Sequence, residues 1–222
     1  MKLYTMPDTC ALAPHIVIKW TGLDIDVEVM PAHGSRLPAY LAVNPHGKVP
    51  ALELDDGSVL TEASAILPLL AELAPADKLG GTDQHERARV AEALGFMIGE
   101  VHSDWTPHFA PQRYLADSVG YPELERVTFE RLAPQYAFLN AGMSANPCLL
   151  FGRRTIADAY LYMLTRTADL MPGALGPFPM LAAFRARLDL DSGVIAALAE
   201  QATPGRYGRV SATTASKMSP VR

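Results

Sequence analysis

The chain has 222 residues, of which 49% are hydrophobic and 19% charged, and its formal net charge is -5. A chain of this length can bury a substantial core, in one large domain or in two small ones. The acidic excess, without any stripe of Lys and Arg, argues against nucleic-acid binding, because phosphate recognition needs concentrated positive charge. No stretch of about eighteen apolar residues is present, so we expect no membrane-spanning helix and no membrane partner.

Two cysteines, Cys10 and Cys148, lie far apart in the sequence. They are too few for a disulfide scaffold or for a zinc site of the usual kind, so we expect no metal. The first residues contain neither a long apolar run nor a cleavage pattern, which argues against a signal peptide. Together these features favour a cytoplasmic protein.

The first third of the sequence alternates between strand and helix patterns. Strands are predicted over residues 2–6, 25–29, 49–54 and 59–61, and helices over 11–20, 38–43 and 63–74. Only the first two strands are separated by a helical crossover long enough for parallel pairing. The last two are joined by a tight turn and form an antiparallel hairpin. The order βαβαββα therefore predicts a small α/β domain.

The rest of the sequence has helical patterns, after a polar linker that contains two consecutive glycines. Helices are predicted over residues 86–102, 122–140, 155–170, 180–187 and 194–201. We therefore expect an α/β domain, a linker, an all-helical domain and an irregular tail, which correspond to residues 1–76, 77–84, 85–203 and 204–222.

Cys10 is the first candidate for chemistry, because it lies in the turn between the first strand and the first helix. There the N–H groups and the positive end of the helix dipole favour a thiolate, the nucleophilic form of cysteine. The alternative is a small buried hydrophobic residue, as most free cysteines are. Cys148, beside Leu149 and Leu150, is expected in the core.

Val49 and Pro50 form a second candidate. Pro50 stands at the head of a predicted strand, where it donates no backbone hydrogen bond and leaves the backbone groups of Val49 free. A cis peptide bond here would turn the N–H and C=O of Val49 toward a ligand in a strand-like contact. The alternative is an ordinary proline of an edge strand.

The helix start at Ala63 and Ser64 is a candidate anion site, because the first N–H groups of a helix have no acceptor within it. A carboxylate would be held there with the Ser64 hydroxyl, while Glu62 would receive an ammonium group. The alternative is a plain helix start. Further along, Thr155 and Asp158 form a capping-box pattern, which we interpret as structural.

In this order and spacing, three segments resemble the cytosolic glutathione transferase family, and the resemblance extends to about Gln201. They are Asn-Pro-His-Gly-Lys-Val-Pro-Ala-Leu at 44–52, Leu-Thr-Glu-Ala-Ser-Ala-Ile at 60–66 and Thr-Ile-Ala-Asp-Ala-Tyr at 155–160. Each is moderately specific, and the ordered set is strongly so. The resemblance implies an α/β plus all-α protein, with a thioredoxin-like domain followed by a helical bundle. It also implies a homodimer that uses glutathione as co-substrate, without a permanently bound cofactor.

Within that family, Cys10 and His102 are similar to the bacterial beta class, which places a cysteine and a histidine beside the glutathione sulfur. The resemblance implies catalytic roles and glutathione contacts for both. His102 would donate a hydrogen bond to the sulfur or transfer a proton, since imidazole titrates near neutral pH. The alternative is a histidine that only packs among the helices. Further implied glutathione contacts are Ser35, Val49, Pro50, Glu62, Ala63 and Ser64.

Two positions depart from the beta-class pattern. Ser35 stands where a lysine usually contacts the glycine end of glutathione, and Arg36 and His33 are alternative substitutes for that lysine. Gly95 replaces an asparagine that commonly precedes the histidine. We therefore expect glutathione binding that is weaker or differently supported.

The implied activity is conjugation of glutathione to small apolar electrophiles, with thiol-disulfide exchange through Cys10 as a further reaction. The electrophile would lie in an apolar cleft between the domains, where Trp105, Phe109 and Tyr114 are candidate wall residues. Two alternatives remain open. One is a glutathione-dependent thiol transferase, peroxidase or dehalogenase on the same fold, and the other is a non-catalytic carrier of apolar ligands or haem.

Overall fold

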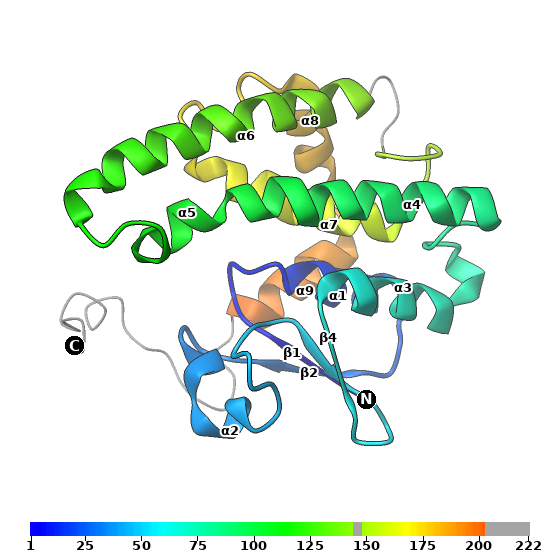
Figure 1. Cartoon of the computed structure of the whole chain (residues 1–222). Coiled ribbons are helices and arrows are strands. Elements are labelled where there is room, and N and C mark those ends of the chain that lie inside the picture. The colour runs from blue at the N-terminus through cyan, green and yellow to red at the C-terminus, as the bar shows by residue number, and fades with distance from the viewer. Residues whose placement is uncertain (144–147, 203–222) are drawn as a thin grey trace.

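The computed structural model describes residues 1–143 and 148–202. Figure 1 shows two layers, a small sheet with its helices below and a bundle of longer helices above. The irregular tail expected at 204–222 lies outside the described residues. Within the described residues, no helix is both long and apolar enough to cross a membrane.

The N-terminal part forms one four-stranded sheet with the strand order β2-β1-β3-β4. β1 pairs in parallel with β2 and antiparallel with β3, while β3 and β4 form an antiparallel hairpin. The predicted parallel pair and hairpin are therefore confirmed. The strands are β1 (Lys2–Thr5), β2 (Asp26–Val29), β3 (Ala51–Glu53) and β4 (Val59–Thr61).

Three helices connect and cover these strands: α1 (Leu12–Thr21), α2 (Pro38–Leu41) and α3 (Ala63–Leu73). The α1 helix ends where its sequence predicts, because Gly22 adopts a left-handed backbone with a φ of 66° and donates its N–H to the carbonyl of Ile18. A short 3₁₀ turn, η1 (Gly34–Arg36), lies between β2 and α2.

The helical part begins at α4 (Gln84–Phe96), which continues without a break into a π-helical turn, η3 (Met97–His102). The single helix predicted over 86–102 is therefore two segments with different twist, and the second ends at His102. The further helices are α5 (Thr106–Phe109), α6 (Tyr121–Met143), α7 (Ile156–Thr167), α8 (Pro179–Leu188) and α9 (Ser192–Ala202). The 3₁₀ turns are η2 (Pro75–Asp77), η4 (Pro111–Arg113), η5 (Ser118–Gly120) and η6 (Ala168–Leu170).

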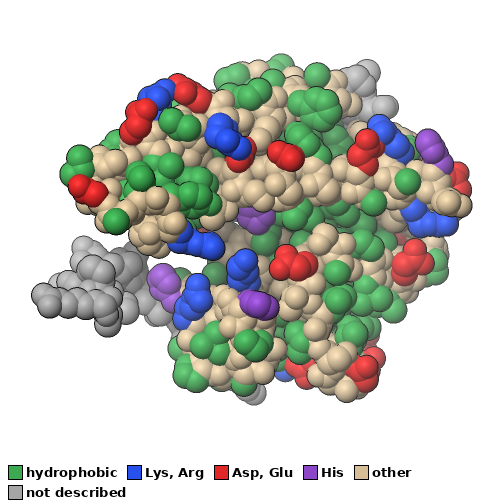
Figure 2. Space-filling view, in the orientation of Figure 1, with side chains coloured by type: hydrophobic (Ala, Val, Ile, Leu, Met, Phe, Trp, Pro, Cys, Tyr) green, Lys and Arg blue, Asp and Glu red, His purple; other side chains and the backbone are tan. Residues whose placement is uncertain are grey.

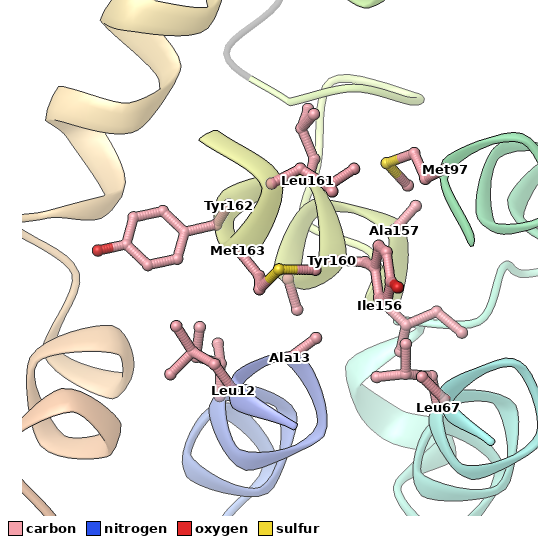
Figure 3. Close-up of a cluster of buried hydrophobic side chains, with 14 of the residues drawn as sticks. Leu12, Ala13, Leu67, Met97, Ile156, Ala157, Tyr160, Leu161, Tyr162 and Met163 are labelled. Carbon is pink, nitrogen blue, oxygen red and sulfur yellow. The ribbon is translucent and has the colours of Figure 1, made fainter. Parts of the chain in front are cut away.

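The core is centred on α7, which is buried along nearly its whole length. Figure 3 shows its side chains against Leu12 of α1, Leu67 of α3 and Met97 of η3. One hydrophobic cluster thus spans the α/β layer and the helical layer, which fixes the two layers against each other. The domain boundaries given above stay a prediction.

The predicted capping box at the start of α7 is confirmed. Asp158 is fully buried, and its carboxylate accepts hydrogen bonds from the Thr155 N–H and hydroxyl and from the Leu149 N–H. Burial raises the pKa of Asp158 to about 6, against the opposing effect of these hydrogen bonds. The cap therefore fixes the start of the helix that carries Tyr160 into the cavity described next.

Candidate active site

A cavity of about 540 Å³ lies between the α/β layer and the helical layer. Figure 2 shows it as a hollow with Lys, Arg and His side chains on both sides. Eight of the predicted site residues line it: Cys10, Ser35, Val49, Pro50, Glu62, Ala63, His102 and Phe109. Ser64 does not line the cavity but is exposed in the first turn of α3, directly after Ala63.

Cys10 and Val49 are adjacent across the floor of this cavity. The Val49–Pro50 peptide bond is cis, which is the first of the two alternatives that its sequence allows. The Cys10 Sγ–H donates to the carbonyl oxygen of Val49 at 3.5 Å. Among the described residues, the backbone N–H of Val49 has no acceptor. A free N–H therefore remains at this edge, as docking of an extended ligand backbone requires.

Burial raises the pKa of the Cys10 thiol to about 12, which disfavours the thiolate in the unliganded protein, and the reactive role of Cys10 stays a prediction. Nearby backbone donors do not offset the burial, since the N–H groups of Ala11 and Leu12 already donate to Thr9. The N–H of Ala13 donates to the Cys10 carbonyl rather than to its sulfur. Cys10 is therefore a neutral thiol that can donate one hydrogen bond.

His102 lies at the end of η3 and faces the same cavity. Its Nδ1 is 2.5 Å from the hydroxyl oxygen of Tyr160. Burial lowers the pKa of His102, which favours the neutral imidazole, and burial raises the pKa of Tyr160, which keeps the phenol protonated.

The hydroxyl of Tyr160 has no other partner among the described residues, and the side chain is fully buried. We assign its O–H as the donor and Nδ1 of His102 as the acceptor, because a buried hydroxyl proton requires an acceptor. The imidazole proton then resides on Nε2. His102 is thus held as a hydrogen-bond donor toward the cavity.

The start of α3 supplies groups of a different kind. Glu62, the residue before the helix, has a φ of 70°, a left-handed backbone that is unfavourable for a residue other than glycine. The N–H groups of Ala63 and Ser64 have no backbone acceptor within the described chain, and no side chain caps them. These free donors form an anion site at the positive end of the helix dipole.

Lys48 is a cavity residue that the sequence analysis did not select, although it directly precedes Val49. Tyr40 and Asn44 hold this loop, because the Tyr40 hydroxyl and the Asn44 side-chain amide both donate to the Lys48 carbonyl, at 2.6 and 2.8 Å. The Lys48 side chain is exposed, and Lys48 and Ser35 both line the cavity. The α/β layer therefore supplies a cation to the cavity although it lacks the usual family lysine.

The expected aromatic wall needs correction. Trp105 does not line the cavity, because it is fully buried and donates its indole N–H to the Tyr136 hydroxyl at 3.1 Å. Tyr114 is 52% exposed and also lies outside the cavity lining. Only Phe109 of the three aromatic residues is at the cavity. The other lining residues from the helical layer include apolar and polar side chains: Ile98, Ser103, Thr106, Arg113, Tyr160, Met163 and Thr167.

Metal coordination has no candidate in the described ranges. In residues 1–143 and 148–202, no three His, Cys, Asp or Glu side chains lie close enough together to hold a metal ion. The cavity lining supplies a thiol, an imidazole, a helix start and a few charged side chains.

A thioredoxin-like α/β layer with a cysteine beside a cis-proline, covered by a helical bundle, defines a class of thiol-binding proteins. The family described as "Glutathione S-transferase, N-terminal domain" matches residues 9–73. A curated relative, glutathione S-transferase GST-4.5 of Xanthomonas campestris, is 34% identical over 89% of this chain and 97% of its own. The chain therefore belongs to the glutathione S-transferase family.

Two solved structures narrow the assignment. A sphingomonad glutathione S-transferase complexed with glutathione is 30% identical, with a TM-score of 0.80, over 91% of this chain and 99% of that one. A beta class glutathione S-transferase of Sphingomonas chungbukensis is 30% identical, with a TM-score of 0.81, over 90% and 98%. The chain is a glutathione transferase similar to the bacterial beta class.

Proposed function

We propose that this enzyme conjugates reduced glutathione to small electrophiles in the cavity between the two layers, with the glutathione sulfur between Cys10 and His102. One observation carries the proposal. Cys10, Val49, the start of α3 and His102 come from distant parts of the chain but line one cavity. A free backbone edge, an anion site and two hydrogen-bond donors are thereby placed around a single ligand-sized space.

The tripeptide would lie along this cavity as an extended strand. Its cysteine backbone would pair with the N–H and C=O of Val49. The carboxylate of the γ-glutamyl end would accept from the start of α3 and the Ser64 hydroxyl, and Glu62 would receive its ammonium group. The glycine carboxylate would then lie near Ser35 and the Lys48 cation.

The catalytic step requires that the glutathione thiol lose its proton, which would pass to solvent water. Hydrogen bonds to the charged form lower a pKa, so donation from the His102 Nε2–H would stabilise the thiolate, as would donation from the Cys10 Sγ–H once it turns from the Val49 carbonyl to the glutathione sulfur. The thiolate would form a carbon–sulfur bond to the electrophile, and the leaving group would depart with the electron pair. The neutral thiol of Cys10 suits this donor role better than the role of a nucleophile in disulfide exchange.

The remaining features are proposed on family grounds. We propose a homodimer and a cytoplasmic location, where a reducing environment keeps glutathione and the two free cysteines of the chain as thiols. Glutathione is proposed as a co-substrate that leaves with the product, with no permanently bound cofactor.

The test combines binding with a panel of reactions. Calorimetric titration with reduced glutathione should give saturable binding, and chlorodinitrobenzene should be conjugated faster than hydroxyethyl disulfide or a peroxide is reduced. A protein that ignores millimolar glutathione contradicts the proposal. Tight binding of an apolar dye, without any glutathione-dependent rate, would instead indicate a carrier.

A further inference from the structure

Arg113 gives the electrophile side of the cavity a positive charge. Among the described lining residues from the helical layer, it is the only Lys or Arg. It lies at the end of η4, where the N–H of Arg113 donates to the Ala110 carbonyl and that of Tyr114 to the Pro111 carbonyl. These hydrogen bonds hold the turn in place. The turn belongs to the helical layer, so Arg113 lines the cavity on the side opposite to the sheet.

The guanidinium of Arg113 has no carboxylate partner among the described residues. Within the described ranges it forms no ion pair and no side-chain hydrogen bond. The nearest acid in its own loop, Asp117, instead accepts from the N–H of Val119 at 2.9 Å. Asp8, which also lines the cavity, has Arg166 at 4.0 Å as its counterion. An unpaired cation therefore faces the cavity.

The charges of glutathione do not require Arg113. In the pose proposed above, Glu62 takes the ammonium group, the start of α3 takes one carboxylate, and Lys48 with Ser35 takes the other. All four of these partners belong to the α/β layer. Arg113, the cation that the helical layer contributes to the cavity lining, therefore remains available to bind the second substrate.

Phe109 gives the helical side of the cavity an aromatic side chain in addition to the cation. It lies four residues before Arg113, is 54% exposed, and its ring stacks on Trp105 at 5.7 Å between centroids. Buried Trp105 therefore supports an exposed aromatic ring that lines the same cavity as Arg113. An aromatic ring and a cation in one cavity lining together match an aryl group that bears an anion.

We propose that the preferred electrophiles of this transferase carry a carboxylate or a similar anionic group, which Arg113 binds while the reacting carbon faces the glutathione sulfur. This inference rests on the proposed function and replaces the expectation of a purely apolar electrophile. Arg113 is then a residue that determines specificity, because it contacts the substrate away from the reacting atoms.

The test uses a matched pair of substrates, chloronitrobenzoate and chloronitrobenzamide, which differ mainly in charge. The wild-type enzyme should have the higher kcat/KM for the benzoate. Arg113→Gln should lower the ratio of kcat/KM for the benzoate to kcat/KM for the benzamide by about five-fold, the size expected for an ion pair open to solvent. A higher salt concentration should lower the same ratio in the wild type. Arg113→Lys should keep part of the ratio. Arg89→Gln, on an exposed arginine of α4 that lies outside the lining, serves as the control.

A second measurement separates this inference from the proposed function. The synthetic glutathione conjugates of the two compounds are titrated calorimetrically into wild type and Arg113→Gln.

Tighter binding of the carboxylate conjugate, lost in the variant, supports the inference even if turnover fails. Turnover without any charge preference leaves the proposed function standing and overturns the inference. The inference is also overturned if Arg113→Gln raises the KM for glutathione equally with both substrates, because Arg113 would then bind glutathione. If neither conjugate binds, both proposals fail.

Discussion

The Nδ1 atom of His102 and the hydroxyl oxygen of Tyr160 lie 2.5 Å apart and connect the π-helical end of α4 to the middle of α7. Tyr160 is fully buried, and its hydroxyl has no other partner among the described residues. The contact fixes both the ring orientation of His102 and the nitrogen that carries its proton. The donor facing the proposed sulfur site is thus set by a side chain that belongs to the core.

The first prediction concerns that contact. Tyr160→Phe removes the hydroxyl and leaves the buried Nδ1 without a donor, so the proton can move to Nδ1 and away from the cavity. We expect kcat for conjugation to fall by about ten-fold, equivalent to the loss of one hydrogen bond to a charged group, while the KM for glutathione changes less. The pH profile of kcat/KM should shift as well, because an O–H donor to Nδ1 stabilises the neutral imidazole and its loss makes protonation of His102 easier. Steady-state kinetics across pH measures both effects.

Tyr162→Phe is the matched control on the same helix. Tyr162 donates to Asp189 at 2.7 Å and does not line the cavity. Its replacement should lower stability without moving the pH profile. Equal kinetic effects of the two substitutions would show that Tyr160 acts only through the stability of α7.

The second prediction separates the two roles of Cys10. If its thiol donates a hydrogen bond, Cys10→Ser keeps a donor and should retain most conjugation activity, whereas Cys10→Ala should lose about ten-fold. Both variants should lose disulfide exchange, which needs a sulfur. Because burial raises the pKa of Cys10 to about 12, its alkylation by iodoacetamide should be slow at neutral pH and should accelerate as pH rises.

Cys148→Ala is the control for both measurements, since Cys148 is buried outside this cavity. Conjugation that falls equally in Cys10→Ser and Cys10→Ala would contradict the donor role. Rapid alkylation of Cys10 at neutral pH would restore the thiolate that the sequence predicts.

The third prediction compares two helix caps. Asp158→Ala leaves buried donors of Thr155 and Leu149 unsatisfied, so we expect a loss of at least about 2 kcal/mol in the free energy of unfolding. Asp83→Ala removes an exposed cap of α4, which accepts from the Glu86 N–H, and should cost about 1 kcal/mol. Urea denaturation measures both, and a larger loss for Asp83→Ala would contradict the argument from burial.

Sequence predicted those site residues whose position follows from the end of a regular element. Cys10, Val49 and Glu62 each lie where a strand or helix begins or ends, so the topology brings them to one edge of the sheet. Trp105 was misplaced, because an aromatic residue near His102 suits a core as well as a cavity wall. The π-helical turn η3, which precedes Trp105, cannot be recognised from the pattern of hydrophobic residues.

The remaining site residues depend on contacts between distant segments. Tyr160 belongs to a motif from which the sequence predicts only the helix cap. Nothing in the sequence indicates that the Tyr160 hydroxyl contacts His102. Arg113 lies in a three-residue 3₁₀ turn, which is too short to have a period. The raised pKa of Cys10 follows from its burial between segments that are distant in the sequence, which becomes visible only in the folded chain.

The last prediction concerns His15, which joins α1 to α9. It is fully buried, with Nε2 at 2.9 Å from Glu200 and Nδ1 at 3.4 Å from the side-chain amide of Gln201. Burial lowers the pKa of His15 below its usual 6.5, although the hydrogen bond to Glu200 opposes this. The folded state therefore binds fewer protons than the unfolded state just below pH 6.5.

The contribution of His15 to the free energy of unfolding should consequently be fully present above this pH. It should decline as the pH falls through the lowered pKa of the folded state, because unfolding then takes up a proton. Urea denaturation at several pH values should show this slope, and His15→Gln should reduce it while His102, whose pKa is also lowered, retains its share. His85→Gln, at an exposed position of α4, should leave the slope as it is. A slope that is the same in His15→Gln and in the wild type would mean that His15 is protonated as easily in the folded chain as in the unfolded one.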